Sequence, residues 1–190
     1  MLENYHIVLA SASPRRQELL KGLDLDFEVR VIPDIDESYP SGLPVAEIPS
    51  YIARKKADAY LSTMKDNEMI ITADTVVVLD NLVIEKPTCS EEAVRMLQKL
   101  SGRTHEVITG VVITTHCRSE AFSVISTVDF SVLTDEEIHY YVDAYRPFDK
   151  AGAYGIQEWI GYIGVQRING SFYNVMGLPV QRLYQELKRF

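Results

Sequence analysis

The amino-acid sequence predicts an α/β protein built on a mixed, twisted sheet with flanking helices. Short runs rich in Val, Ile and Thr alternate with segments whose apolar residues recur every three to four positions. Turn residues separate some of these runs closely enough to predict hairpins, which favours a mixed sheet over a purely parallel one. No Pro/Gly/Ser-rich linker and no internal repeat divides the chain, so we predict one domain spanning residues 1–190.

The predicted strands and helices follow from these periodicities in chain order. Strands are expected at residues 6–10, 27–32, 69–79, 82–85, 106–115 and 121–133. Helices are expected at residues 14–21, 50–64, 91–100, 135–145 and from 180 to the C-terminus. Two capping boxes, Thr88 with Glu91 and Thr134 with Glu137, support the third and fourth helices. The Asn-Gly pair at 169–170 predicts a closing hairpin.

The composition argues against several classes of function. A formal net charge of −8 disfavours general binding of nucleic acid, which depends on neutralising phosphates. No run of about 18 apolar residues is present, so we expect no membrane span. The first apolar stretch lacks the basic region of a secretory signal peptide. Cys89 and Cys117 form neither a disulfide framework nor a metal cluster, which favours a reducing, cytoplasmic location.

The segment 11–16, with the sequence SASPRR, follows the first predicted strand and opens the first helix. Ser13 suits the N-cap, and the proline after it suits the first helical position. Arg15 and Arg16 then add positive charge where the helix dipole already favours anions. With free backbone amides and the Ser11 and Ser13 hydroxyls, this loop would bind phosphate. The alternative is a capped helix whose arginines point into water.

One lysine interrupts the apolar face of the second predicted helix. At 100° per residue, Lys56 falls within the arc formed by Ile52, Ala53, Ala57 and other apolar residues. Its side chain either extends to the rim of the apolar face or reaches into a cleft to bind an anion. The helix alone does not decide between the two.

The strongest anomaly is Asp74, which lies inside a run, 69–79, apolar enough to be buried on both faces. A buried carboxylate is costly unless it is neutral, paired with a cation or bound to a metal. If residues 80–81 form a two-residue turn, Thr75 lies opposite Lys86, which brings Lys86 within one residue of Asp74. The alternative is a buried Asp–Lys pair without a catalytic role.

Two further segments carry polar side chains suited to a nucleotide. The acidic residues at 34–37 form either a solvated turn or a source of a carboxylate ligand for magnesium. The segment 147–157 combines two glycines with an aromatic ring and ends at Gln157, whose amide can donate to and accept from the edge of a base. An ordinary loop before a strand is the alternative for this segment.

Taken together, these segments resemble the Maf family of nucleoside triphosphate pyrophosphatases. The resemblance rests on S-A-S-P-R-R at 11–16, A-D-T at 73–75, E-K-P at 85–87, S-G-R-T-H-E-V at 101–107, D-K-A-G-A-Y-G-I-Q at 149–157 and I-N-G-S-F-Y-N-V-M-G-L-P at 168–179. These motifs occur in the family's order over essentially the whole chain. They imply an elongated, two-lobed fold with a central cleft, shared with the inosine triphosphate pyrophosphatase superfamily.

The resemblance also implies roles for individual residues. Asp74 takes the role of proton acceptor, beside a divalent metal, Mg²⁺ or Mn²⁺, with Glu37 as a second carboxylate on the metal side. A shift of the alignment by one residue would put Asp36 in the place of Glu37. Further roles in catalysis are implied for Lys56 and Lys86, and roles in binding or choosing the substrate for Ser11, Ser13, Arg15, Arg16, Thr75 and Gln157.

The distal motifs look like the branch of the family that acts on dTTP and UTP. The implied reaction is hydrolysis of these nucleotides, with modified pyrimidine nucleotides left open, to the monophosphate and pyrophosphate. The alternatives are a 7-methyl-GTP pyrophosphatase, a phosphatase that releases orthophosphate, and a non-catalytic nucleotide sensor linked to cell division. The sequence does not decide whether the chain forms a homodimer.

Overall fold

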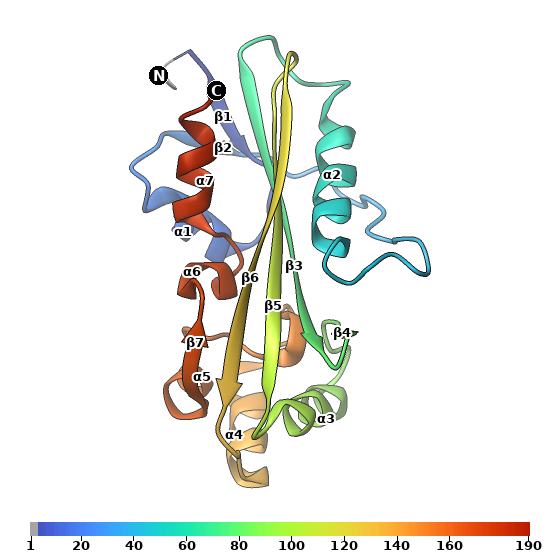
Figure 1. Cartoon of the computed structure of the whole chain (residues 1–190), viewed down its shortest axis with the longest axis vertical. Coiled ribbons are helices and arrows are strands. Elements are labelled where there is room, and N and C mark those ends of the chain that lie inside the picture. Colours follow the sequence, from blue (N-terminus) through green and yellow to red (C-terminus); the bar gives the residue numbers. More distant parts are fainter. Residues whose placement is uncertain (1–3) are drawn as a thin grey trace. The chain divides into compact units, whose positions relative to one another are not determined.

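The computed structural model describes residues 4–190, whose strands form one mixed sheet (Figure 1). The strands are β1 (His6–Leu9), β2 (Phe27–Val29), β3 (Glu68–Leu79), β4 (Leu82–Ile84), β5 (Thr104–Thr114), β6 (Ser119–Phe130) and β7 (Val165–Asn169). Their order is β2-β1-β3-β5-β6-β7, with β4 paired to β3 off this path. β1 runs parallel to β2 and β3, whereas β4 and β7 are antiparallel to β3 and β6. The predicted mixed sheet is confirmed.

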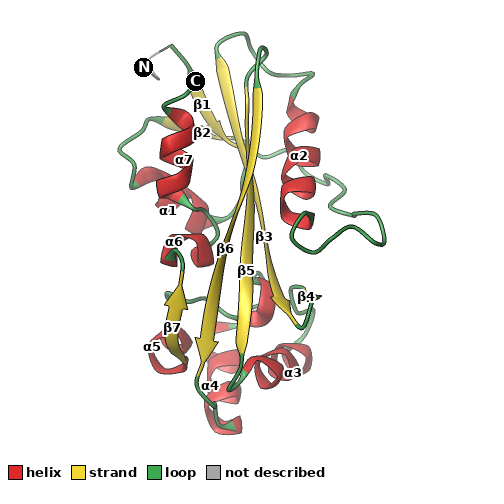
Figure 2. Cartoon of the chain, viewed as in Figure 1, coloured by secondary structure: helices red, strands yellow, loops and turns green. Residues whose placement is uncertain are grey.

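Helices flank the sheet (Figure 2). They are α1 (Pro14–Lys21), α2 (Ile48–Tyr60), α3 (Ser90–Leu100), α4 (Asp135–Tyr145), α5 (Trp159–Gly164), α6 (Phe172–Met176), α7 (Val180–Leu187) and the short 3-10 helix η1 (Ala151–Ala153). All the predicted helices are present, although α2 begins and ends earlier than predicted, and η1, α5 and α6 were not predicted. Within residues 4–190, no helix combines the length and the apolar character that crossing a membrane requires.

The capping box predicted for α3 is wrong, whereas the one at the start of α4 is present as predicted. The N-cap of α3 is Cys89, whose side chain makes no capping bond. Thr88 instead donates through its N–H and its hydroxyl to the Glu92 carboxylate, at 2.7 and 2.8 Å. Because the N-cap lies one residue later than the predicted box requires, Glu92 rather than Glu91 occupies the third helical position.

The predicted hairpin at residues 169–170 is also wrong. β7 ends at Asn169, and the chain then enters α6 instead of a second strand. The Ser171 N–H donates to the Ser126 hydroxyl at 3.0 Å, and that hydroxyl donates to the Ser171 carbonyl at 3.3 Å. Gly170 has a φ of 129°, and a Cβ there would lie 2.8 Å from Ser126 Cβ. The Asn-Gly pair therefore carries the chain closely past Ser126 into a helix.

The chain divides into two compact units. Unit 1 comprises Met1–Asp74, Thr109–Val124 and Gly177–Phe190, and unit 2 comprises Thr75–Ile108 and Ile125–Met176. The boundary after Asp74 falls inside β3, the one before Thr109 inside β5 and the one after Val124 inside β6. Each of these three strands therefore contributes residues to both units. The cleft implied by the family resemblance stays a prediction.

In unit 1, α2 packs on one face of the strands. Side chains alternate between the faces of a strand, and Val8 and Ile70 share the face on which Tyr60 of α2 packs. Thr72 adds a buried hydrogen bond from its hydroxyl to the Ala53 carbonyl, at 2.7 Å. Figure 1 shows α1 and α7 on the other side of these strands from α2. Apolar contact and one buried hydrogen bond therefore fix α2 along β3.

Unit 2 begins with the β3–β4 hairpin. Asp80 and Asn81 have positive φ angles of 52° and 63°, and Leu79 pairs with Leu82, so the predicted two-residue turn is confirmed. Helices α3 and α4 pack against each other beyond this hairpin. The buried side chains of this core include Leu97, Leu100, Val128, Phe130, Ile138, Tyr141, Tyr154 and Ile156.

Gly110 of β5 lies directly against the first turn of α2, and we predict that a side chain there destabilises unit 1. A Cβ at Gly110 would lie 2.5 Å from Ser50 Cα, with the adjoining peptide backbone closer still. Gly110→Ala should therefore lower the free energy of unfolding by about 2 kcal/mol or more, measured by urea denaturation. Gly22→Ala is the matched control, because a Cβ at Gly22 meets only carbonyl oxygens at 3.3 Å or more. Equal effects of the two changes would contradict the packing argument.

Candidate active site

The centre of the candidate site is an ion pair between β3 and α2 in unit 1. Lys56 Nζ lies 2.9 Å from Asp74 Oδ1, and each side chain is only 13% exposed. The hydrogen bond between Thr72 and Ala53 explains why Lys56 and Asp74 meet. Asp74 lies two residues beyond Thr72 on the same strand face, and Lys56 lies about one helical turn beyond Ala53. The lysine on an apolar helix face and the carboxylate in an apolar strand are therefore partners.

Glu37 joins this pair from the loop after β2. Glu37 Oε1 lies 3.1 Å from the same Lys56 Nζ, and the Glu37 side chain is half exposed. The neighbouring Asp36 accepts a hydrogen bond from Lys55 Nζ at 2.8 Å, which is the main cause of the lowered pKa of Asp36. Glu37 and Asp74 thus share one ammonium group, whereas Asp36 is bonded to another lysine.

A guanidinium from the start of α1 adds positive charge to this group. Arg16 Nε donates to the carbonyl of Gly177, in the C-terminal motif, at 2.8 Å. Burial is the main cause that lowers the pKa of Arg16, and Arg15 also lowers it, while Asp74 and Glu37 act in the opposite direction. A guanidinium stays protonated despite such a shift. Arg16 therefore places a partly buried positive charge within electrostatic reach of Asp74.

The N-terminus of α1 has the geometry of an anion site. Ser13 is the N-cap with an extended backbone, and its hydroxyl makes no capping bond. The Ser11 hydroxyl instead accepts a hydrogen bond from the Ser13 N–H, at 3.2 Å. No acidic residue lies in the first turn, where Arg15 and Arg16 stand. Of the two interpretations of this loop, a first turn that carries two arginines and no acidic residue of its own favours phosphate binding.

The other predicted site residues, Thr75, Lys86 and Gln157, belong to unit 2. Thr75 is partly buried in β3, and Lys86 is exposed two residues beyond the end of β4. The cation that pairs with Asp74 is Lys56, and not Lys86 as the predicted hairpin register suggested. The hairpin register was right, but α2 supplies the nearer ammonium group.

Gln157 stands out in unit 2 because its side-chain oxygen is unsatisfied. Gln157 Oε1 is buried and has no hydrogen-bond partner within residues 4–190. Five residues earlier, the Gly152 N–H donates to the Glu85 carbonyl at 3.1 Å, next to Lys86. Gly152 has a φ of 71°, and a Cβ there would lie 3.0 Å from the Val77 side chain. The segment that ends at Gln157 thus contacts β3 and the loop after β4 that carries Lys86.

A buried histidine supports the same segment. His105 Nε2 lies 2.7 Å from the Tyr154 hydroxyl, and the His105 ring packs edge-on against Phe130 and Tyr154. His105 Nδ1 is buried without a partner in the part of the chain that the structure describes. Burial lowers the pKa of His105 to about 4. The histidine is therefore a neutral core residue at physiological pH, and it holds Tyr154 three positions before Gln157.

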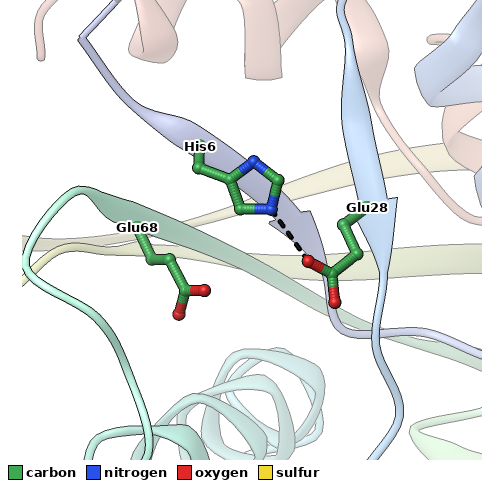
Figure 3. Close-up of side chains that lie close together, drawn as sticks. All are labelled: His6, Glu28 and Glu68. Atoms are coloured by element: carbon green, nitrogen blue, oxygen red, sulfur yellow. Dashed lines mark hydrogen bonds and ion pairs between the residues drawn. The ribbon is translucent and has the colours of Figure 1, made fainter.

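A second group of ionisable side chains lies on the neighbouring strands β1, β2 and β3 of unit 1. Figure 3 shows His6, Glu28 and Glu68 on β1, β2 and β3, with His6 bonded to Glu28 at 2.8 Å. One ligand atom from each lies within 4.8 Å of the others, so the group could hold a metal ion. Arg30 already bonds both carboxylates, at 2.7 Å to Glu68 and 2.9 Å to Glu28, and lowers the pKa of each to about 2. A metal ion would have to displace Arg30.

Sequence reasoning missed several contacts around the site. The Gly177 carbonyl gave no signal because a backbone acceptor leaves no side-chain pattern. Tyr141 and Glu158 were also missed, although the Tyr141 hydroxyl donates to the Glu158 carboxylate. Lys150, whose Nζ lies 3.1 Å from Glu158 Oε1, belongs to the motif at 149–157, but the sequence alone indicates no partner for it. Only the position of Lys150 in a motif that also carries Asp149 and Gln157 could have indicated this network.

Comparison with known proteins identifies the family of the chain. A family model described as Maf-like protein matches residues 6–190. The chain belongs to the Maf-like protein family. It is 65% identical over 193 residues to a Parabacteroides distasonis protein named dTTP/UTP pyrophosphatase, covering all of both chains. It is 60% identical to a Bacteroides thetaiotaomicron protein of the same name, covering 99% of this chain and 97% of that protein.

A solved structure supports the fold of this Maf-like protein. The chain matches the Staphylococcus aureus Ham1 protein with a TM-score of 0.54 and 16% sequence identity, covering 96% of this chain and 99% of that one. At this identity the match concerns the fold alone. The family resemblance and the expected α/β fold, with a mixed sheet and flanking helices, are confirmed.

His105 gives this Maf-like protein a predictable loss of stability in acid. The pKa of His105 is about 4 in the folded chain, against the ordinary value of 6.5, so the unfolded chain binds more protons between these values. The stability that the neutral His105 contributes to the folded chain is fully present above pH 6.5 and is lost as the pH falls toward 4. Between pH 7 and pH 4.5, His105→Phe should lose about 2 kcal/mol less unfolding free energy than the wild type, measured by urea denaturation.

The matched control for this prediction is His139→Phe, because His139 is exposed on α4. This control should keep the wild-type dependence on pH. If His105→Phe and the wild type lose the same unfolding free energy over this range, His105 is not the group responsible.

Proposed function

We propose that this chain hydrolyses dTTP and UTP to the nucleoside monophosphate and pyrophosphate. The observation that carries the proposal is the buried Asp74 carboxylate, paired with Lys56 and within electrostatic reach of Arg16. The names of the full-length relatives at 65% and 60% identity support the choice of dTTP and UTP. Modified pyrimidine nucleotides with the same hydrogen-bonding edge fit the proposal equally.

The carboxylates of Asp74 and Glu37 fit a divalent metal. Both lie within 3.1 Å of one Lys56 Nζ, so their oxygens converge on a common region. Mg²⁺ is commonly bound by one or two carboxylates together with water and substrate phosphates, and Mn²⁺ prefers the same hard oxygen ligands. When bound there, Mg²⁺ or Mn²⁺ would neutralise charge on the phosphate oxygens. Asp36 is the poorer candidate because Lys55 already holds its carboxylate.

The triphosphate is bound in this proposal by the start of α1 and by lysines. The Ser11 and Ser13 hydroxyls, the backbone N–H groups of the first turn and the Arg15 and Arg16 guanidiniums supply donors for phosphate oxygens. Lys56 and Lys86 add charge without a fixed donor geometry. Positioning and neutralisation of this kind account for most of the catalysis of phosphoryl transfer.

Asp74 acts as the general base in this proposal. Its carboxylate accepts a proton from a water molecule whose oxygen attacks the α-phosphorus. The bond from the α-phosphorus to the oxygen that bridges to the β-phosphorus breaks, and pyrophosphate leaves. Lys56 offsets the cost of burying the carboxylate and fixes its orientation. Thr75 and Gln157 determine which base is accepted, and Gln157 presents an acceptor to the N3–H of uracil or thymine.

The test of this function is product analysis with Mg²⁺ or Mn²⁺ across dTTP, UTP, CTP, GTP, ATP and 7-methyl-GTP. We expect pyrophosphate, released mainly from dTTP and UTP. Pyrophosphate released mainly from 7-methyl-GTP would replace the proposed substrate. Orthophosphate would indicate a phosphatase, and tight binding without any product would indicate a nucleotide sensor.

Asp74→Asn should lower turnover of dTTP by about 10²–10⁴-fold, because the amide cannot accept the proton from water. The variant keeps the size of the side chain, and Glu37 still pairs with Lys56, so the protein should stay folded, as a cooperative melting transition would show. Asp80→Asn is the matched control, since Asp80 is an exposed carboxylate in the adjoining hairpin, paired with Arg103. Near-normal turnover of Asp74→Asn at saturating dTTP would remove Asp74 from the mechanism.

A further inference from the structure

We propose that Tyr141 and Glu158 are positioning residues that orient the Gln157 amide and so set the preference for pyrimidines that carry an N3–H. The inference rests on the proposed function, since it concerns base selection by the same site. It adds to that function a network, within unit 2, that fixes which end of the Gln157 amide is presented to the base.

Tyr141 of α4 joins the two ends of this network. Its hydroxyl donates to Glu158 Oε2 and accepts a hydrogen bond from the Gly155 N–H at 3.0 Å. Tyr141 is fully buried, and burial is the first cause that raises its pKa, followed by the bond to Glu158. The phenol therefore stays protonated at any working pH and always has a proton to donate. One hydroxyl thus ties the backbone before Gln157 to the side chain after it.

Glu158 is held at both of its carboxylate oxygens. Oε2 accepts from the Tyr141 hydroxyl, and Oε1 lies 3.1 Å from Lys150 Nζ. Lys150 is itself buried and also pairs with Asp149 at 2.8 Å. Glu158 stands at the N-cap of α5, yet its side chain makes no capping bond. An N-cap side chain usually accepts a hydrogen bond from the first turn of its helix, whereas the Glu158 carboxylate binds Tyr141 and Lys150 instead.

Gly155 shows where the Gln157 amide lies relative to this carboxylate. A Cβ at Gly155 would lie 3.0 Å from Gln157 Nε2 and 3.0 Å from Glu158 Oε2. Both atoms therefore pack over the bare face of Gly155, close to a common point. The amide NH₂ carries positive partial charge, and a neighbouring carboxylate favours it over the amide oxygen. Glu158 accordingly keeps the NH₂ end of Gln157 toward itself.

The orientation that follows leaves the amide oxygen for the substrate. Gln157 Oε1 is buried and without a partner within residues 4–190. A ligand that donates a hydrogen bond to this oxygen would offset the cost of burying it. Uracil and thymine carry an N3–H donor, whereas N3 of cytosine has only a lone pair. A Gln157 amide that is free to rotate by 180° would present its NH₂ group instead, which pairs with the cytosine N3. The Tyr141–Glu158 network is therefore expected to disfavour CTP.

The experiment compares Tyr141→Phe with Tyr145→Phe in the full chain. Tyr145 is the matched control, because its ring stacks on Tyr141 at 5.0 Å and it is partly exposed on the same helix. The measured quantity is the ratio of kcat/KM for dTTP to kcat/KM for CTP, with pyrophosphate as the product. Tyr141→Phe should lower this ratio roughly tenfold, chiefly through the KM values, the effect of one misplaced hydrogen bond. Tyr145→Phe should leave the ratio unchanged.

A second pair of variants tests Glu158 directly. Glu158→Ala should lower the dTTP to CTP ratio as Tyr141→Phe does, whereas Glu158→Gln keeps an acceptor for the Tyr141 hydroxyl and should restore part of it. Gln157→Leu sets the scale, since it removes the amide itself. A purely structural network predicts lower melting temperatures with an unchanged ratio in Tyr141→Phe and Glu158→Ala, and that result would overturn the inference.

The wild-type measurement separates this inference from the proposed function. If the wild type releases no pyrophosphate from dTTP or UTP, the proposed function fails and the inference fails with it. If the wild type prefers dTTP and UTP to CTP but the variants keep that preference, only the role of Tyr141 and Glu158 is refuted.

Discussion

The candidate active site depends on one electrostatic constraint, the burial of Asp74 inside an apolar strand. A carboxylate there is tolerable only with a cation in contact, and Lys56 supplies it from α2. That contact requires α2 to lie along β3 in one register, which Thr72 sets by bonding the Ala53 carbonyl. The close approach of α2 to β5 at Gly110 serves the same alignment. The packing of α2 along β3 and the ion pair at the centre of the site therefore depend on the same alignment.

The sequence predicted the parts of this arrangement that leave a local signature. Asp74 interrupts an apolar run, Lys56 interrupts an apolar helix face, and Arg15 and Arg16 stand where a helix favours anions. Each was recognisable because its burial or position carries a cost that a ligand or partner must offset. The pairing of Asp74 with Lys56 rather than Lys86 was not predictable, because it depends on how α2 docks on β3.

The errors have a related cause. The helix start at Cys89 and the turn at residues 169–170 were misjudged because local motifs were interpreted without tertiary contacts. At 169–170 the pairing of Ser126 with Ser171 decides the path of the chain, and residues 45 positions apart leave no local pattern. The network of Tyr141 and Glu158 escaped notice for the same reason, since an amphipathic helix supplies Tyr141 and the start of another supplies Glu158.

The charges around Asp74 also bear on how an acidic protein binds a highly anionic substrate. Lys56 is shared by Asp74 and Glu37, and Arg16 feels the same two carboxylates, so the positive charge of this group is already largely balanced. A triphosphate approaching that group would meet little net attraction from it. A divalent cation on the two carboxylates would reverse the balance and release Lys56 and Arg16 to act on phosphate oxygens. The balance of Lys56 and Arg16 by Asp74 and Glu37 is therefore a reason, from charge alone, for the divalent metal proposed at this site.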